Sequence, residues 1–381
     1  MNGPELIASE AGLTALLRQL RAAPVLAVDT EAASFHRHAD RIYLIQVSTS
    51  ETTAIIDPLA VPDLSGFGAL LADPAIEVVF HDADYDLRLF DMQYGFRASR
   101  LFDTRVAAEL LNEPGLSLAA LLERHFGVRV DKRFQRADWS ARPLSQEMLA
   151  YAADDTRHLV ALRDLLRGRL EETGRLSWAE EEFVAMTQVR WAPDDEREPG
   201  WLRLKGAKAL PPRQLAILRE VHRWREEVAA KTDRAEFRIL GNEALLAIAQ
   251  QAPATPEALA AIKGLGRDTL QRRGRAILAA VRRAQRLKAD ELPRVERPPR
   301  HPREPEIEAR LARLKAARTT ISGRLGLPPG VVCPNSVLDA IARSVPGTRK
   351  ELAGVPGMRR WQVEAFGNDL LAALAPAVRT P

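Results

Sequence analysis

The sequence predicts an α/β domain with a mixed sheet and flanking helices, followed by two small all-α domains. Three observations lead to this expectation. Short apolar runs alternate with segments of helical periodicity in the first half of the chain. In the second half, apolar residues recur at helical spacing. The helical pattern around Leu218 then repeats around Leu311, which is typical of a duplicated domain.

Composition sets the outer bounds. A chain of 381 residues is too long for one ordinary domain. Its hydrophobic fraction of 46% and charged fraction of 28% are typical of a soluble globular protein. No window offers about 18 consecutive apolar residues, and the N-terminus lacks a secretory signal pattern. The single Cys333 excludes an intramolecular disulfide and a cysteine-based zinc site. We expect a cytoplasmic location and no membrane partner.

Charge divides the chain into an acidic front and a basic back. Residues 1–207 hold 23 Lys and Arg against 33 Asp and Glu, a net charge of −10. Residues 208–381 hold 32 against 18, a net charge of +14. A basic half can hold a polyanion such as nucleic acid, and an acidic half can hold metal ions. The alternative is ordinary variation of surface charge.

The elements of the front half follow in a regular order. An amphipathic helix is expected over residues 5–22 and ends before Pro24. Three strands in close succession predict an antiparallel meander at 25–29, 41–49 and 52–56. A short helix at 64–71 and a buried strand at 76–80 come next. Later helices are expected at 104–111, 118–125, 157–172 and 177–191, with another long helical segment after Ser145.

The first strand ends in an Asp-x-Glu pair, Asp29 and Glu31. Side chains at positions i and i+2 of a strand point to the same face, so the two carboxylates project together. Two adjacent carboxylates repel each other and raise each other's pKa, unless a cation lies between them. Divalent ions such as Mg²⁺ prefer oxygen ligands of this kind. The alternative is a solvated Asp and Glu in a turn.

Three further carboxylates follow the strand at 76–80. Acidic residues are favoured near a helix N-terminus, so helix capping explains Asp82 and Asp84. Asp86 lies one turn further into the helix and needs a separate reason. A metal site at the carboxyl edge of the sheet supplies one, because open α/β sheets bind ligands at that edge.

The loop at 131–144 combines four basic residues with a Phe and a Trp. Such a loop can hold phosphates and stack a base. The candidate nucleic-acid-binding residues in it are Lys132, Gln135, Trp139 and Arg142. The alternative is a surface loop held in place by Trp139 in the core.

The helix after this loop carries Tyr151 and Asp155, which lie four residues apart and share one helix face. The intervening Ala152 and Ala153 leave room around them. A phenol and a carboxylate on one face can position a water beside a metal. The alternative is a buried Tyr and a solvated Asp.

Together these motifs, in this order, resemble the tyrosine-containing branch of the DEDD superfamily of 3′–5′ exonucleases, and within it the ribonuclease D family. The resemblance covers roughly residues 5–190 and includes the strand with Gln46 and the spacing from His81 to Asp86. The stretch at 32–36 departs from the family's Phe-x-Arg-type sequence. Which of its residues contact the terminal nucleotide is therefore open.

The resemblance implies a ribonuclease H-like fold and hydrolysis with two divalent ions, Mg²⁺ or Mn²⁺, about 3.5–4 Å apart. By this analogy Asp29 bridges both ions, Glu31 and Asp155 complete the shell of one, and Asp86 serves the other. Tyr151 orients the attacking water. Its pKa near about 10 makes it a poor base at neutral pH. The implied product is a nucleoside 5′-monophosphate.

The basic half is expected to contain two copies of one helical module. A shift of 93 residues places Arg225 on Arg318 and Asn242 on Asn335. Asn242 is expected to cap a helix. Both copies resemble the HRDC domain, an auxiliary nucleic-acid- or protein-binding unit. One helix of the first copy carries the candidate RNA-binding residues Arg272, Arg273, Arg275, Arg282 and Arg283. The alternative is a helical packing module with a solvated basic face.

The expected organisation is a 3′–5′ exonuclease domain with two HRDC-like domains and two linkers. The boundaries are 1–191 for the exonuclease domain, 192–210 for a connector, 211–288 for the first HRDC-like domain, 289–306 for a Pro-rich linker and 307–376 for the second HRDC-like domain.

The predicted activity is a 3′–5′ exoribonuclease that trims RNA 3′ ends, with precursor tRNA as the implied substrate, acting as a monomer. A 3′–5′ DNA exonuclease is the alternative within enzymes. A catalytically inactive RNA-binding scaffold is the alternative outside them, and the presence of all five motif residues argues against it.

Overall fold

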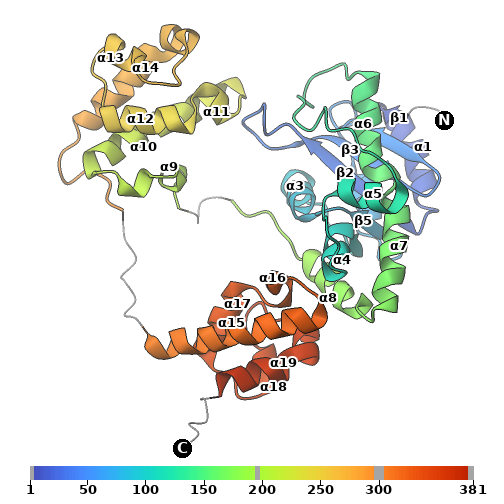
Figure 1. Cartoon of the computed structure of the whole chain (residues 1–381). Helices are drawn as coiled ribbons and strands as arrows, with labels where there is room; N and C mark the ends of the chain where they lie inside the picture. Colours follow the sequence, from blue (N-terminus) through green and yellow to red (C-terminus); the bar gives the residue numbers. More distant parts are fainter. Residues whose placement is uncertain (1–3, 194–197, 296–303, 376–381) are drawn as a thin grey trace, which may run out of the picture.

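The computed structural model describes residues 4–193, 198–295 and 304–375. We call these three parts the N-terminal domain, the first helical domain and the second helical domain. Figure 1 shows the first helical domain near one end of the N-terminal domain and the second near α8. Residues 194–197 of the predicted connector and 296–303 of the Pro-rich linker lie outside the described residues.

One six-stranded mixed sheet forms the centre of the N-terminal domain, in the order β1-β4-β3-β2-β5-β6. β2, β3 and β4 pair antiparallel, which confirms the predicted meander, and β1, β5 and β6 add to it in parallel. The strands are β1 (Glu5–Ile7), β2 (Val25–Ala32), β3 (Ile42–Ser48), β4 (Thr53–Ile56), β5 (Glu77–Phe80) and β6 (Leu101–Asp103).

The expected helix over residues 5–22 is wrong at its start. Residues Glu5–Ile7 form β1, which pairs with β4, and the helix α1 begins only at Glu10. Ser9 caps it by accepting from the backbone N–H of Gly12 at 3.2 Å. A three-residue edge strand is too short to show a periodicity of its own, and β6 was missed for the same reason.

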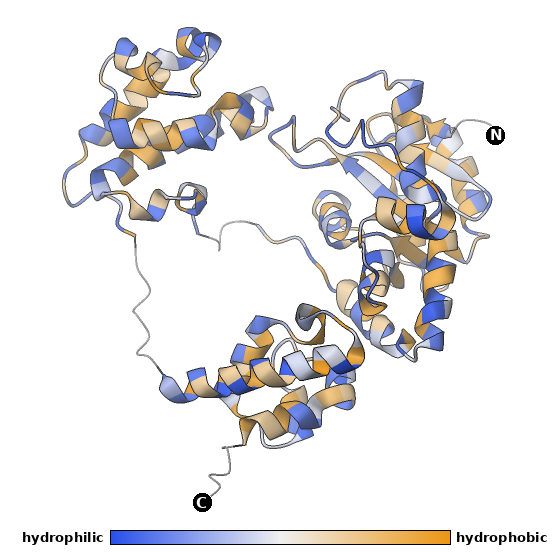
Figure 2. Cartoon of the chain, viewed as in Figure 1, coloured by the Kyte–Doolittle hydropathy of each residue, from blue (hydrophilic) through white to orange (hydrophobic). Residues whose placement is uncertain are grey.

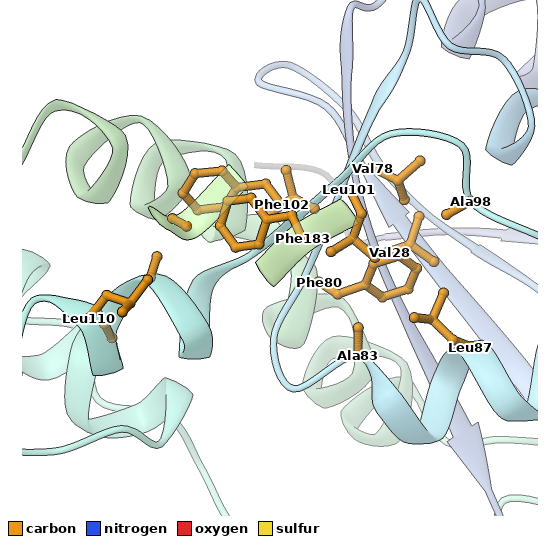
Figure 3. Packing of buried hydrophobic residues seen from close by; sticks show 14 of the residues in the cluster. Val28, Val78, Phe80, Ala83, Leu87, Ala98, Leu101, Phe102, Leu110 and Phe183 are labelled. Atoms are coloured by element: carbon orange, nitrogen blue, oxygen red, sulfur yellow. The ribbon is translucent and has the colours of Figure 1, made fainter. Parts of the chain in front are cut away.

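Helices cover both faces of the sheet. The helices of this domain are α1 (Glu10–Leu20), α2 (Ser65–Leu71), α3 (Asp84–Tyr94), α4 (Thr104–Leu110), α5 (Leu118–Phe126), α6 (Gln146–Arg157), α7 (Leu159–Glu172) and α8 (Leu176–Met186). α6 packs across the meander strands β2, β3 and β4. Around β5 and β6, Figure 3 shows Phe80, Phe102 and Phe183 among the apolar side chains that fill the core.

The two helical domains repeat one internal arrangement. The first contains α9 (Gly200–Arg203), the 3₁₀ helix η2 (Ala207–Ala209), α10 (Pro212–Thr232), α11 (Glu236–Ile239), α12 (Asn242–Gln251), α13 (Pro256–Ala260) and α14 (Arg267–Gln285). The second contains α15 (Pro305–Leu325), α16 (Pro329–Val332), α17 (Asn335–Ser344), α18 (Arg349–Ala353) and α19 (Arg360–Leu374). In both, apolar residues line the facing sides of the helices (Figure 2).

Equivalent side chains make the same internal contacts in each of the two copies. Arg225 donates to the Asn242 side chain at 2.6 Å and to the Leu240 carbonyl, while Arg318 donates to the Asn335 side chain at 2.9 Å and to the Cys333 carbonyl. These contacts are consistent with the duplication. They also correct the expected cap at Asn242, because its side chain accepts from an arginine on another helix and Gly241 occupies the cap position.

Two more positions repeat with the same offset. Gly264 and Gly357 both have positive φ, at 91° and 82°, in the turn before the last helix of each copy. Side chains are disfavoured in that region of backbone space, so glycine fits both turns. None of the helices in the described part of the chain is long and apolar enough to span a membrane.

Candidate active site

Two elements bring the predicted carboxylates together. Asp29 and Glu31 lie on β2, where their neighbours across β3 are Gln46 and Leu44. α6 covers this face of the sheet, and its fully buried Ala152 and Ala153 allow a close approach. The hydroxyls of Ser48 on β3 and Thr156 on α6 lie 2.7 Å apart, which fixes the helix against the strand. This packing carries Tyr151 and Asp155 to the end of β2.

Asp29, Glu31 and Asp155 form one group of carboxylates. Each offers an oxygen, and these oxygens all lie within 4.8 Å of one another. Burial, followed by the charge of Asp155, raises the pKa of Asp29 well above its ordinary value. Burial and then the charge of Asp29 raise the pKa of Glu31, and burial raises that of Asp155 to about 7.

These three residues fit a divalent cation. All their donors are carboxylate oxygens, which hard divalent ions prefer. The raised pKa values show that negative charge is costly at this place, and a bound cation removes that cost. Each side chain also keeps part of its surface exposed, so an ion from solution can reach it.

Asp86 lies beside this group but outside it. It stands on the first turn of α3, only 7% exposed, and Thr30 Oγ1 donates to its Oδ1 at 2.5 Å. Burial and then the charge of Asp29 raise the pKa of Asp86. A role as ligand of a second ion therefore stays a prediction.

Neither Asp82 nor Asp84 caps α3 with its side chain, although Asp84 lies in the first turn, where the helix dipole favours an acidic residue. The cap position of α3 is Ala83, and it has no side-chain cap. Its backbone N–H donates to Asp103 at 2.8 Å instead. Asp84 forms an ion pair with Arg88 one turn along the helix, since an acid and a base at i and i+4 share one helix face.

Tyr151 lies against the same carboxylates. Its ring stacks on Trp139 with centroids 6.0 Å apart and meets the edge of Phe134 at 5.7 Å. Burial, then the charges of Asp155 and Glu31, raise the pKa of Tyr151 above its ordinary value. The phenol therefore keeps its proton at neutral pH.

Two of the four candidates in the loop at 131–144 need correction. Trp139 is 1% exposed and packs in the core beneath α6, so it cannot stack a base. Arg142 donates from two nitrogens to Asp57, each at 2.8 Å, and to the Tyr43 carbonyl at 3.0 Å, so it fastens the loop to the sheet. Lys132 and Gln135 are exposed, and their contact with RNA stays a prediction.

The five arginines of α14 differ in their surroundings. Arg273 is half-buried and donates to the Ile239 carbonyl. Arg272 pairs with Asp268, and Arg283 with Glu220. Arg275 and Arg282 are exposed, and within the described residues neither lies within ion-pair distance of a carboxylate. RNA binding by this helix stays a prediction.

The sequence reasoning assigned no role to Gln46, although it noted the residue. Gln46 is fully buried directly opposite Asp29, and its amide has no hydrogen-bond partner within the described residues. Residues directly opposite in an antiparallel pair have side chains on the same face, about 5 Å apart. An uncharged polar group therefore stands beside the carboxylates. The strand register that places it there cannot be read from Gln46 alone.

Comparison with known families is consistent with this geometry. Residues 4–171 match the family model described as 3′–5′ exonuclease, and residues 214–281 and 307–374 each match the HRDC domain. Ribonuclease D of Granulibacter bethesdensis is 33% identical over 377 residues, which cover 97% of this chain and 92% of that protein. The chain belongs to the ribonuclease D family. It is therefore a phosphodiester hydrolase of the 3′–5′ exoribonuclease class.

Other relatives agree. Ribonuclease D of Escherichia coli K12 is 32% identical over 293 residues, which cover 76% of this chain and 77% of that protein. The crystal structure of E. coli RNase D, described as an exoribonuclease involved in structured RNA processing, superposes with a TM-score of 0.69 at 27% identity and covers 98% of this chain and 99% of that one. The catalytic core of RRP6 from Trypanosoma brucei gives 0.66 at 26% identity, over 74% and 79%.

Proposed function

We propose that this chain shortens structured RNA from its 3′ end, with precursor tRNA as a substrate, and releases nucleoside 5′-monophosphates. The observation that carries the proposal is the group of three carboxylates from β2 and α6 beside a protonated tyrosine. The group is complete within one chain, so the proposed activity needs no residue from a second copy, and we propose that the enzyme acts as a monomer.

The carboxylates would hold the metal ions. Asp29, Glu31 and Asp155 would bind one divalent ion, Mg²⁺ or Mn²⁺, and Asp29 with Asp86 would serve a second. When bound, such a pair of ions activates the attacking water and stabilises the leaving oxygen. Thr30 keeps the Asp86 carboxylate oriented through its hydrogen bond.

Tyr151 would position the attacking water. Because its raised pKa keeps the proton on the phenol, it can donate one hydrogen bond and accept another, but it cannot serve as the base. Trp139 and Phe134 hold its ring from two sides, so the hydroxyl has little freedom to move. Replacing Tyr151 by Phe keeps this packing and removes only the hydroxyl.

Product analysis on a 3′-extended tRNA, with Mg²⁺ or EDTA, tests the activity. Asp155→Asn removes a metal-binding charge at nearly constant shape, and we expect nucleotide release to fall by at least about 100-fold, because metal-supplied charge stabilisation is worth several kcal/mol. Asp154→Asn is the matched control. Asp154 is the next residue, keeps 42% of its side-chain surface exposed and pairs with Arg157. Its charge adds to the burial that raises the pKa of Asp155, but it is not part of the carboxylate group, so this variant should keep most of its activity.

The outcomes separate the proposed activity from its alternatives. Equal activity of the Asp155→Asn and Asp154→Asn variants would contradict the site assignment. Faster release from a matched DNA oligomer than from RNA would favour the DNA exonuclease. Binding of RNA without metal-dependent release of mononucleotides would favour the inactive scaffold.

A further inference from the structure

Two exposed phenylalanines meet at the junction of the N-terminal domain and the first helical domain. Phe35 lies in the turn that follows β2, and Phe237 lies on α11. Their ring centroids are 4.9 Å apart with the planes inclined at 55°. Phe35 is 39% exposed and Phe237 is 47% exposed. Two large apolar rings that stay this exposed while in contact are unusual for side chains that serve packing alone.

Two arginines flank the rings. The guanidinium carbons of Arg136 and Arg238 lie 5.3 and 5.4 Å from the centroid of the Phe35 ring. Both arginines are exposed, and within the described ranges neither has a carboxylate at ion-pair distance. The cluster therefore combines aromatic faces with two positive charges that form no ion pair in the part of the chain that the structure describes.

The cluster is held in place from both domains. The His36 carbonyl accepts from the Ala235 backbone N–H at 3.0 Å. The Phe35 carbonyl accepts from Arg238 Nε at 2.8 Å, and His36 Nε2 lies 2.8 Å from the Arg136 carbonyl. These bonds fix three segments that are far apart in sequence, so the cluster forms only while the two domains are docked.

The cluster lies close to the carboxylates along the chain. Phe35 follows Glu31 by four residues, a span of at most about 14 Å. Phe134, two residues before Arg136, contacts the ring of Tyr151. Stacked nucleotides rise by about 3.4 Å each, so this distance corresponds to no more than about four of them.

We propose that Phe35 and Phe237, with Arg136 and Arg238, form a stacking platform for an unpaired base a few nucleotides upstream of the RNA 3′ end. The inference rests on the proposed function, since it extends the path of the same RNA strand. Aromatic and guanidinium faces stack bases with little sequence preference, and the two charges favour the adjoining phosphates. A 3′ end must then be single-stranded up to the platform before its last nucleotide reaches the carboxylates.

Binding of a single-stranded RNA of about eight nucleotides tests the platform. Fluorescence anisotropy would use the full chain with Asp29→Asn, so that the RNA stays intact. We expect Phe237→Ala to weaken binding by about tenfold, the effect typical of one lost base stack. Phe237→Trp should retain affinity, because it keeps an aromatic face. Phe126→Ala is the matched control, since Phe126 is 38% exposed on α5 and has no ring contact within the described residues.

An abasic RNA distinguishes stacking from mere docking of the two domains. Single abasic positions are moved along the oligomer from its 3′ end. With an intact platform, one position should weaken binding by about tenfold. With Phe237→Ala, the same position should cost nothing further. Equal abasic losses with and without Phe237 would overturn the proposal. Mononucleotide release by the unmodified chain reports the proposed function separately.

Discussion

The two helical domains share one internal arrangement but differ in how they contact the N-terminal domain. The second is packed on it: Trp361 of α19 is 3% exposed and stacks on Trp178 of α8 at 4.6 Å, while Glu182 accepts from the Trp361 indole N–H at 2.9 Å. The apolar core of this copy is continuous with that of the N-terminal domain, whereas the first helical domain has a core of its own.

Equivalent positions show how the copies diverged. The position of Trp361 in the second copy is occupied in the first by Asp268, which pairs with Arg272 on the surface. Conversely, Arg275 and Arg282 of the first copy correspond to Asn368 and Ala375 in the second. The internal contacts were kept, while the outer face of the last helix became a packing surface in one copy and a basic surface in the other. The last helix therefore offers a packing surface in the second copy and exposed arginines in the first.

Removing the packing residue of the second copy should have the largest effect on stability. Trp361→Ala leaves a large cavity between α8 and α19, and we expect the free energy of unfolding to fall by about 3–5 kcal/mol. Denaturant titration of the full chain measures it. Asp268→Ala, at the equivalent position of the first copy, should change it by less than about 0.5 kcal/mol. Equal losses would contradict the division between the copies.

The second-largest effect concerns the response of the two helical domains to metal, which should stabilise the unfolding transition of one and not of the other. Because the second helical domain shares its core with the N-terminal domain, we expect these two to unfold together and the first helical domain separately. Mg²⁺ or Mn²⁺ at about 100 times its dissociation constant should stabilise the joint transition by about 2.7 kcal/mol relative to EDTA. Calorimetry resolves the transitions. A metal-induced shift of the first helical domain's own transition would count against this picture.

The pH dependence in EDTA follows from the same carboxylates. The pKa of Asp155 is raised by folding to about 7, so the folded state binds more protons than the unfolded state between about pH 4 and 7. The contribution of Asp155 to the stability of the joint transition should therefore fall as pH rises through this range, and Asp29 and Glu31 act in the same direction. His81, whose pKa is lowered by burial to about 4, acts in the opposite direction, so the comparison with Asp155→Asn isolates the carboxylate. Added metal should abolish the fall, and Asp155→Asn should reduce it. An equal pH dependence in the unmodified chain and in the Asp155→Asn variant would refute the assignment.

The parts of the site that depend on neighbouring residues in the sequence could be predicted, and those that depend on contacts between distant elements could not. Asp29 with Glu31, and Tyr151 with Asp155, were predictable because strand and helix periodicities place each pair on one face. The inward orientation of Trp139 and Arg142 was not predictable, because it depends on their contacts with Tyr151 and Asp57 in distant elements. The same holds for Asn242, whose partner Arg225 comes from another helix.

At the level of the fold, strands with clear apolar runs were predictable and three-residue strands were not. β1 is defined by its pairing with β4, which lies almost fifty residues away in sequence. The platform at Phe35 escaped sequence reasoning for a related reason. Its parts come from the turn after β2, the loop before α6 and α11, and only docking of two domains brings them together.

The smallest expected effect concerns the basic face of α14. Each phosphate contact in single-stranded RNA contributes about 0.7 to the slope of log affinity against log salt concentration. Arg275→Gln together with Arg282→Gln should therefore reduce the magnitude of this slope by about 1–2, with a loss of affinity that grows as salt is lowered. The matched control is Arg324→Gln with Arg343→Gln, which removes the same charge from the second copy. Those two arginines already pair with Asp369 and Asp339, so they have little charge to offer to RNA and their loss should leave the slope unchanged. Equal slopes for the two double variants would mean that net charge, rather than the basic face of the first copy, governs RNA binding.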